Sequence, residues 1–322
     1  MKVYGQINYT GTMKYQGSTL NLEYISDDYQ NGLTLTKGYI GGGYVSNAGW
    51  TVVTTIQNST DAWGTSANAS LGTALRYCAW SSSHVSGYMH YADQGNYLMN
   101  KKMAFSSESV SAIGNRNYGS YNPYFFQHGI GYNPDGSFYG TKAFSMGTDS
   151  TNYDKLNYPT DAWTAASDGN IYTGNGTYGQ AWFDKLYGFS LANDDVTRRY
   201  PFSTETWSTI TASPGVVATT SAWPKSVNTK NGKTYVGRGN LVTPFMKFMH
   251  ITYSYQANPF NQTLNNDEQS PVMGQFHGYY AGGYNGVQNA HTDRIEYMTD
   301  TVINIPDAPR ALSSGAAMWS GY

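Results

Sequence analysis

Histidine and cysteine, the residue types most suited to metal binding or nucleophilic catalysis, are sparse in this chain. The six histidines are spread along the sequence, at His84, His90, His128, His250, His277 and His291. No two of them have the H-x-H or HExxH spacing that brings two imidazoles to one metal ion. We interpret the one cysteine, Cys78, as a small buried hydrophobe in a strand-like segment that also holds Trp80. The sequence therefore predicts neither a metal site nor a cofactor.

Carboxylates could act in pairs, as they do in glycoside hydrolysis, but six of the 21 acids here belong to a repeated pattern. The pattern reads aromatic, any residue, Ser or Thr, Asp or Glu, any residue, and then Trp or another large apolar residue. Its clearest copies are Tyr158-x-Thr160-Asp161-x-Trp163 and Phe202-x-Thr204-Glu205-x-Trp207. Among the acids outside the pattern, six candidates for catalysis have no repeated basic partner: Asp93, Asp135, Asp168, Asp184, Asp293 and Glu296. We therefore predict that the repeated acids serve the fold rather than catalysis.

Five more segments follow the same frame, although the copy at Asn58 lacks the aromatic and the copy at Tyr255 lacks the acid. Their key residues are Tyr24 and Asp27, Asp61 and Trp63, Phe105 and Glu108, Tyr255 and Phe260, and Tyr297 and Asp300. The seven copies start at positions 24, 58, 105, 158, 202, 255 and 297, which are 34 to 53 residues apart. A period of about 40 to 50 residues with several short strands per unit is typical of β-propellers. Leucine-rich and β-helix repeats are much shorter, so the period argues against a solenoid.

The composition agrees with an all-β fold. Charged residues make up 12% of the chain, aromatic residues 16%, and 36 residues are Gly, which excludes a helical bundle or a coiled coil. Aromatic side chains at alternate positions of a strand face one side and pack on a neighbouring sheet. The Ser/Thr and the acid are expected at the bend into the next strand, where their side chains satisfy backbone N–H groups. Seven such units account for the whole chain as a single domain, residues 1–322.

Residues 278–322 resemble a kelch repeat. The resemblance is carried by Gly282-Gly283, Tyr297, Asp300, Val302, Pro309-Arg310 and the small-residue strand that begins at Gly315. The aromatic residue and the large residue are five positions apart, which is shorter than the usual kelch gap. The opening Gly38-Tyr39-Ile40-Gly41-Gly42-Gly43 also looks like the kelch-like repeat proteins of marine and cyanobacterial-type tailed bacteriophages.

This resemblance implies a seven-bladed kelch-like β-propeller and a place in the virion, as a component of the tail, neck or fibre. We expect the strand-like segments 3–7 and 316–319 to share one blade, so that the N- and C-terminal strands close the ring and leave no free sheet edge. The expected function is a non-enzymatic assembly protein whose partners are other virion structural proteins.

Kelch-type folds also include copper radical oxidases, in which a Tyr cross-linked to a Cys acts with two His. Propeller glycosidases, which use paired carboxylates, are a further enzymatic alternative. Because Cys78 is predicted to be buried and the repeated acids are predicted to be turn residues, we expect no enzymatic activity.

Aromatic residues in loops are the candidates for binding a partner. Tyr, Trp, Asn and Gln in loops can stack on sugar rings or contact another protein. The candidates are Tyr44 and Trp50 in one loop, Tyr121 and Tyr124 in the aromatic run 118–126, and Tyr284 and His291 in another loop. A module that binds a host-surface glycan or receptor is therefore the alternative function.

Charge and hydropathy exclude several partners. The net charge is −2, and Lys101-Lys102 and Arg198-Arg199 are isolated pairs, so we expect no nucleic-acid binding. No stretch approaches 18 apolar residues and the first residues lack an apolar signal core, so we expect no membrane insertion and no signal peptide. The expected location is the virion, assembled in the host cytoplasm.

Overall fold

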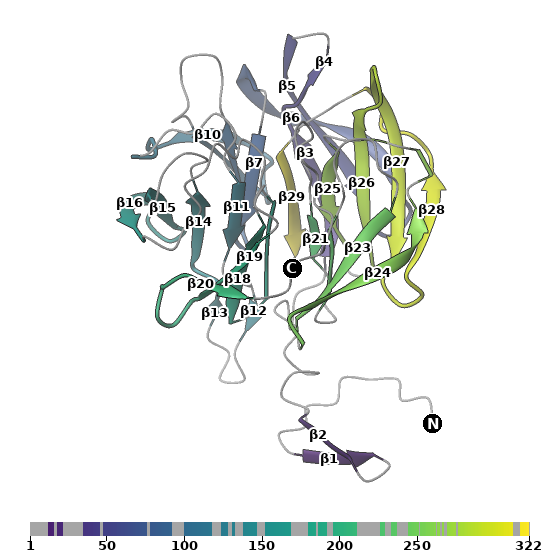
Figure 1. Cartoon of the computed structure of the whole chain (residues 1–322). Helices are drawn as coiled ribbons and strands as arrows, with labels where there is room; N and C mark the ends of the chain where they lie inside the picture. The colour runs from purple at the N-terminus through teal and green to yellow at the C-terminus, as the bar shows by residue number, and fades with distance from the viewer. Residues whose placement is uncertain are drawn as a thin grey trace.

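The computed structural model is all-β, with strands and no helix among the residues that it describes (Figure 1). These residues are 12–15, 18–21, 35–45, 48–75, 78–91, 100–117, 124–127, 131–132, 138–146, 152–168, 180–184, 186–191, 196–210, 226–228, 233–236, 244–250, 252–261, 263–264, 266, 269–274, 276–311 and 316–321.

Six antiparallel sheets share one plan, in which four strands pair side by side as a meander. We name the sheets A to F and give their strands from the first to the fourth. Sheet A holds β29 (Ala316–Gly321), β3 (Leu35–Gly41), β5 (Ala48–Gln57) and β6 (Ala62–Leu75), and β4 (Tyr44–Val45) also pairs with β5. Sheet B holds β7 (Cys78–Ser82), β8 (Ser86–Tyr91), β9 (Asn100–Ala104) and β10 (Val110–Ile113). Sheet C holds β11 (Tyr124–Gln127), β14 (Lys142–Met146), β15 (Asn152–Asn157) and β16 (Ala162–Ser167).

The other three sheets follow in chain order. Sheet D holds β17 (Gln180–Phe183), β18 (Tyr187–Leu191), β19 (Thr197–Pro201) and β20 (Ser208–Ile210). Sheet E holds β21 (Ser226–Asn228), β22 (Lys233–Val236), β23 (Pro244–Met249) and β24 (Ser254–Asn261). Sheet F holds β25 (Ser270–Met273), β26 (His277–Tyr284), β27 (Gln288–Glu296) and β28 (Thr301–Ile305). Two separate hairpins are formed by β1 (Thr12–Tyr15) with β2 (Ser18–Asn21), and by β12 (Gly131–Tyr132) with β13 (Phe138–Tyr139).

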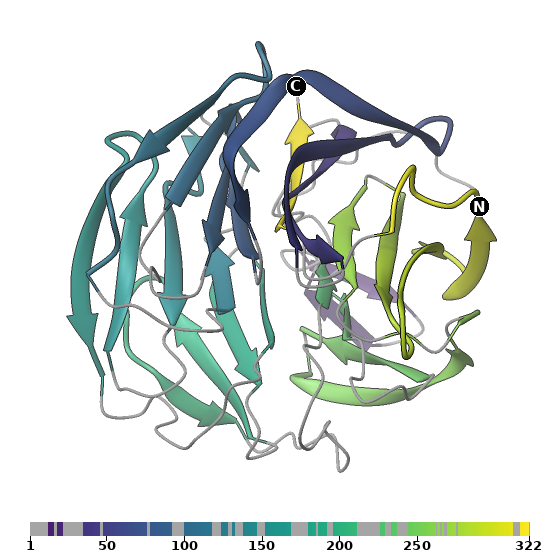
Figure 2. The ribbon, with the colours of Figure 1, turned by 90° about the horizontal axis from the view of Figure 1, so that it is seen from above.

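The first strands of successive sheets contact one another. These contacts run from β29 to β7, β11, β17, β21 and β25, and β25 in turn contacts β29. Figure 1 and Figure 2 both show the yellow strand β29 inside the body of the molecule, beside β3. Ala316 pairs with Gly41 and Met318 with Tyr39, so the end of the chain supplies the first strand of a sheet whose other strands lie near its beginning.

Seven four-stranded units were expected, and the described residues form six sheets of this plan. The motif copy with Tyr24 and Asp27, and the segment 3–7 that was expected to share a blade with the C-terminal strand, lie outside the described residues. Within the described residues, the C-terminal strand pairs with the Gly-rich strand β3.

The second strand of each sheet repeats a small residue followed by an aromatic residue. The pairs are Gly38-Tyr39, Gly87-Tyr88, Ala143-Phe144, Gly188-Phe189, Thr234-Tyr235 and Gly278-Tyr279. At Gly38 the reason is a close approach between sheets, because an added Cβ would lie 2.2 Å from Val272 Cγ1 on β25 of sheet F. A small residue here lets the second strand of one sheet lie against the first strand of its neighbour.

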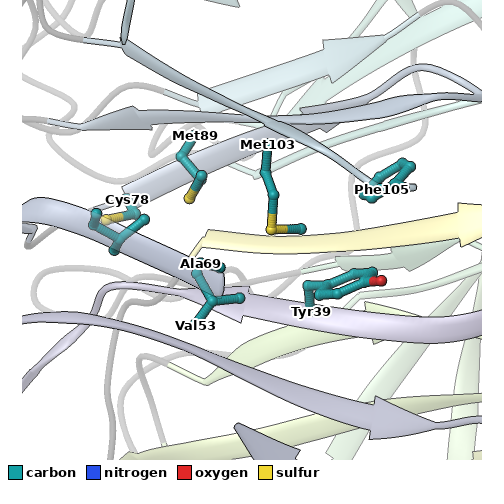
Figure 3. Close-up of a cluster of buried hydrophobic side chains, with 8 residues drawn as sticks. Tyr39, Val53, Ala69, Cys78, Met89, Met103 and Phe105 are labelled. Atoms are coloured by element: carbon teal, nitrogen blue, oxygen red, sulfur yellow. The ribbon is translucent and has the colours of Figure 1, made fainter. Parts of the chain in front are cut away.

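Hydrophobic side chains are buried between neighbouring sheets. In the cluster of Figure 3, Tyr39 and Val53 of sheet A pack with Cys78, Met89 and Met103 of sheet B, and all five are at most 2% exposed. Similar clusters join sheet A to F, B to C, D to E and E to F. The core is therefore a set of layers between sheets, as expected for sheets packed face to face.

We predict that Gly38→Ala destabilises the protein, because the methyl group would overlap the Val272 side chain. Overpacking of this kind costs about 1 to 3 kcal/mol. Thermal unfolding measures the effect. Gly114→Ala is the matched control, since its nearest neighbour, Trp163 Cδ1, lies 4.0 Å from the added Cβ. Equal melting temperatures for the two variants would contradict the close approach of β3 and β25.

Candidate functional site at the strand corners

The turn between the third and fourth strands, which we call the corner, has the same backbone in every sheet. Six non-glycine residues among those described have a positive φ, between 50° and 55°. They are Asp61, Glu108, Asp161, Glu205, Tyr253 and Asp300, one in each sheet. Five of them are the acids of the sequence motif, which therefore marks the corner as expected.

Local hydrogen bonds explain why the chain turns at these positions. The backbone N–H of Asp61 donates to Gln57 O (2.9 Å), and that of Asp300 donates to Glu296 O (3.0 Å). Asp tolerates the left-handed conformation better than most residues. The hydroxyl residues that flank the acid pair with each other, as in Thr299 Oγ1 and Thr301 Oγ1 at 2.7 Å. The carboxylate of the acid takes no part in these local hydrogen bonds and extends away from its own corner.

Each carboxylate binds side chains of the neighbouring sheet rather than the backbone N–H groups that the sequence suggested. Asp161 of sheet C accepts hydrogen bonds from Lys102 Nζ (2.8 and 3.0 Å) and Tyr88 Oη (3.0 Å) of sheet B. Both donors come from central strands, where Tyr88 on β8 pairs directly with Lys102 on β9. A cation and a phenol of one sheet thus bind the corner acid of the next sheet.

A cation of the neighbouring sheet binds the corner acid at four other junctions as well, and a phenol takes part at three of them. Glu205 of sheet D binds Lys142 and Lys155 of sheet C, each at 2.7 Å. Asp300 of sheet F binds Lys233 (2.6 Å), Lys247 (2.7 Å) and Tyr235 of sheet E.

The two remaining carboxylates involve sheet A. Glu108 of sheet B binds Lys37 and Tyr39 of sheet A. Asp61 of sheet A binds Tyr279 Oη (2.8 Å) and Arg294 of sheet F. This last contact joins residues more than 200 positions apart in the chain.

Aromatic stacking accompanies the ionic contact. The first aromatic of the motif stacks on the second-strand aromatic of the neighbouring sheet, as in Tyr158 on Tyr88, with ring centroids 4.8 Å apart. The other stacked pairs are Tyr39–Phe105 at 5.4 Å, Phe144–Phe202 at 5.7 Å and Tyr235–Tyr297 at 6.1 Å. Offset aromatic pairs add about 0.5 to 1.5 kcal/mol beyond their burial, so each of these four junctions combines an apolar layer with a charged one.

The last motif position packs at the same junctions. Trp163 meets the buried His90 of sheet B edge-on, with centroids 5.3 Å apart. Trp63 donates from Nε1 to Pro306 O (2.9 Å), which follows β28 of sheet F. Trp207 is 3% exposed and lies 5.0 Å from the Tyr200 ring of its own sheet.

Burial and neighbouring charges shift several pKa values at the corners. Burial alone would raise the pKa of Asp300, but hydrogen bonds from Lys233, Lys247 and Tyr235 outweigh it and lower the pKa to about 2. For Glu205, burial is likewise outweighed by Lys142 and Lys155, and the pKa is lowered. These carboxylates are charged near neutral pH and hold the cations of the adjacent sheet.

Sheet E has its corner in a different place from the expected one. The sequence frame began at Tyr255 and ended at Phe260, but both residues lie on the fourth strand, β24. The corner lies five residues earlier, with His250 in the first position, Tyr253 at a φ of 50° and Tyr255 in the position of the Trp. Tyr255 packs 5.0 Å from Phe248. The true copy was missed because it has neither the Phe, Tyr or Trp of the first position nor the acid, whose places are taken by His250 and Tyr253.

The basic partners of the corner acids were missed in the sequence, although they too are periodic. A Lys or Arg stands three residues before the first motif position in five sheets, at Lys102, Lys155, Arg199, Lys247 and Arg294. Sheet A has Thr55 there and uses Lys37 of β3 instead. The fixed spacing of these cations was visible in the sequence, but the acid that such a cation binds lies in another repeat.

Two of the loop candidates lie at the opposite end of the sheets from the corners. Trp50 lies at the start of β5, and the Arg310 guanidinium lies over its ring, 4.7 Å from the ring centre. Arg310 also donates to Thr54 Oγ1 (3.0 Å) and Val52 O (3.1 Å), and burial lowers its pKa to about 10. One face of Trp50 is therefore occupied by the chain itself.

His291 on β27 belongs to a polar cluster. Its Nε2 lies 2.6 Å from Thr263 Oγ1 and 3.3 Å from Asp293 Oδ1. Burial raises the pKa of Asp293, although Thr263 and His291 oppose this. The cluster joins the connection between sheets E and F to β27. His291 therefore has polar partners within the fold itself.

The other candidates lie on different strands or outside the described residues. Tyr284 is partly exposed at the end of β26, where it pairs with Gln288. Tyr44 lies on β4 and Tyr124 on β11. Tyr121 lies outside the described residues. The structure therefore does not gather the six candidates into one site.

Among the residues described, no group of three or more His, Cys, Asp and Glu side chains is placed to hold a metal ion. Cys78 is 1% exposed in the cluster between sheets A and B. The buried His90 contacts Ser81 Oγ (3.1 Å) and Asn100 Oδ1 (2.9 Å), and burial lowers its pKa to about 3. Its imidazole is held neutral within the sheet.

No protein-family model matches the chain, and no curated protein matches it either. In the part of the chain that the structure describes, no helix has the length and apolar character needed to cross a membrane.

We predict that Asp300→Asn lowers the free energy of unfolding at pH 7 by about 1 kcal/mol, a value that allows for the partial exposure of the carboxylate. Because the folded-state pKa lies below the usual 3.8, this stabilisation is present above about pH 4 and is lost as the pH falls towards 2. Denaturant unfolding of both proteins over this pH range measures it. A gap that stays constant down to pH 2 would contradict the assignment. The exposed Asp307→Asn is the control, with little expected change.

Proposed function

We propose that the six sheets are blades of a closed, kelch-like β-propeller and that the chain is a non-enzymatic assembly protein of a tailed-phage virion. Six blades are favoured over the seven counted in the sequence, since β29 contacts the first strands on both sides of it, β25 and β7. The contact from Asp61 to Arg294 supports closure between the first and last blades.

The observation that carries the docking role is a set of exposed apolar side chains at equivalent turns. Val85, Leu186 and Phe276 are 53%, 46% and 65% exposed. Each is the residue before the second strand, and its carbonyl accepts a backbone hydrogen bond from the first motif position, as in Phe105 N to Val85 O at 3.0 Å. They therefore lie beside the corners at one end of their sheets. Exposed apolar side chains at equivalent turns suit contact with another protein.

The charged and aromatic repeat supports the same role. Its carboxylates, cations and rings are engaged with neighbouring sheets, as Asp161 is with Lys102, so the repeat stiffens a frame that presents turns and loops. A rigid frame lowers the entropic cost of docking on other subunits.

Mass spectrometry of purified particles and a docking variant test the proposal together. We predict that the chain is found in virions and that Phe276→Ser reduces its incorporation severalfold with an unchanged melting temperature. Val287→Ser is the matched control, because Val287 is 66% exposed but lies in the β26–β27 hairpin at the other end of sheet F. A chain that is absent from particles and works as a soluble monomer would end the proposal.

Binding of a host-surface glycan or receptor is the second candidate. The observation in its favour is the partly exposed Trp50 beside Arg310, since an aromatic ring next to a cation can contact a sugar or an acidic group. A glycan array with Trp50→Ala as the negative control distinguishes this candidate from docking alone.

A further inference from the structure

The junction between sheets D and E lacks the group that the other five junctions share. In five sheets the corner residue is Asp or Glu, and in sheet E it is Tyr253, with the same backbone conformation. The position that receives the acid has nevertheless kept its cation. Arg199 on β19 pairs with Phe189 on β18, just as Lys102 pairs with Tyr88 and Arg294 with Tyr279 in their sheets.

Two tyrosine rings take the place of the carboxylate around Arg199. Its guanidinium lies 5.0 Å from the ring centres of both Tyr187 and Tyr253. The two rings are nearly perpendicular, with centroids 6.0 Å apart. The burial of Tyr253 raises the pKa of its phenol.

No described carboxylate neutralises this cation, and Arg199 Nε has no hydrogen-bond partner among the described residues. Asp184 is the nearby acid, but its oxygens already serve the turn before β18. They accept from Leu186 N (2.8 Å) and Tyr187 N (2.7 Å), and lie 3.5 Å from His250 Nδ1.

The three side chains form a set with more donors than acceptors. A guanidinium has five N–H donors and each phenol adds an O–H. All three side chains are partly exposed, so a ligand can approach from outside. We propose that the Arg199–Tyr187–Tyr253 site binds a carboxylate that the chain itself does not supply, from an acidic side chain of a partner protein or from a small carboxylic acid. The argument for a carboxylate is internal, since it is the group held at the five other corners.

Nitrogen-15 NMR of the arginine side chains tests this on the intact protein. Acetyl-glutamate amide serves as the side-chain probe, acetate as the free-acid probe and acetyl-glutamine amide as the neutral match. We expect a saturable shift of the Arg199 guanidinium resonances with both acids and none with the amide. The signal is assigned by its loss in Arg199→Lys. No saturable shift with either acid, an equal shift with the amide, or tighter binding of inorganic phosphate would overturn the proposal.

A matched pair of variants gives an independent readout. Tyr253→Asp supplies the missing carboxylate from within, whereas Tyr253→Asn offers the same tolerance of positive φ without the charge. We expect Tyr253→Asp to melt roughly 2 °C above Tyr253→Asn at low salt and to lose the NMR response to the acids, while Tyr253→Asn keeps it. Equal melting temperatures together with an intact response in Tyr253→Asp would contradict the site. The outcome is separate from the virion proposal, because neither measurement uses particles.

Discussion

The structure depends on the carboxylate of the corner residue, which has a left-handed backbone conformation. This carboxylate binds a cation, beside an aromatic ring, of the neighbouring sheet. The corner conformation directs the carboxylate outward, as at Asp161, and the central strands of the neighbour present Lys102 and Tyr88 to it. A single exposed pair of this kind contributes little. Here the pair lies over stacked rings and a buried apolar layer, so ionic, aromatic and hydrophobic contacts coincide at one junction.

This arrangement relates the low charge of the chain to its architecture. Only 12% of residues are charged, and many of them meet between sheets instead of covering the surface. Lys233 and Lys247, on adjacent strands, both bind Asp300, so that one acid binds two cations. The ends of the sheets are left with polar loops and a few exposed apolar turns such as the one at Phe276. A frame of this kind is better suited to presenting surfaces than to concentrating reactive groups, which is the basis of the proposed assembly role.

The sequence predicted the all-β class and the corners where the local pattern is complete, because aromatic, hydroxyl and acidic residues each have a local reason to occupy a turn. It did not predict the partner cations, since Lys155 and Glu205 lie 50 residues apart and meet only through the packing of sheets. It misplaced the corner of sheet E because Tyr253 keeps the backbone conformation without the acid. Of the candidate binding residues, it did not anticipate that Trp50 would be covered by Arg310, which arrives from the far end of the chain.

The central claim is most directly tested where the contact joins the two ends of the chain, between Asp61 of sheet A and Arg294 of sheet F. A double-mutant cycle with Asp61→Asn and Arg294→Met measures their coupling in the free energy of unfolding. The account predicts a favourable coupling of about 1 kcal/mol that weakens at high salt. Strictly additive effects of the two substitutions would show that sheets A and F are not coupled through this corner, and would contradict the proposed closure of the ring.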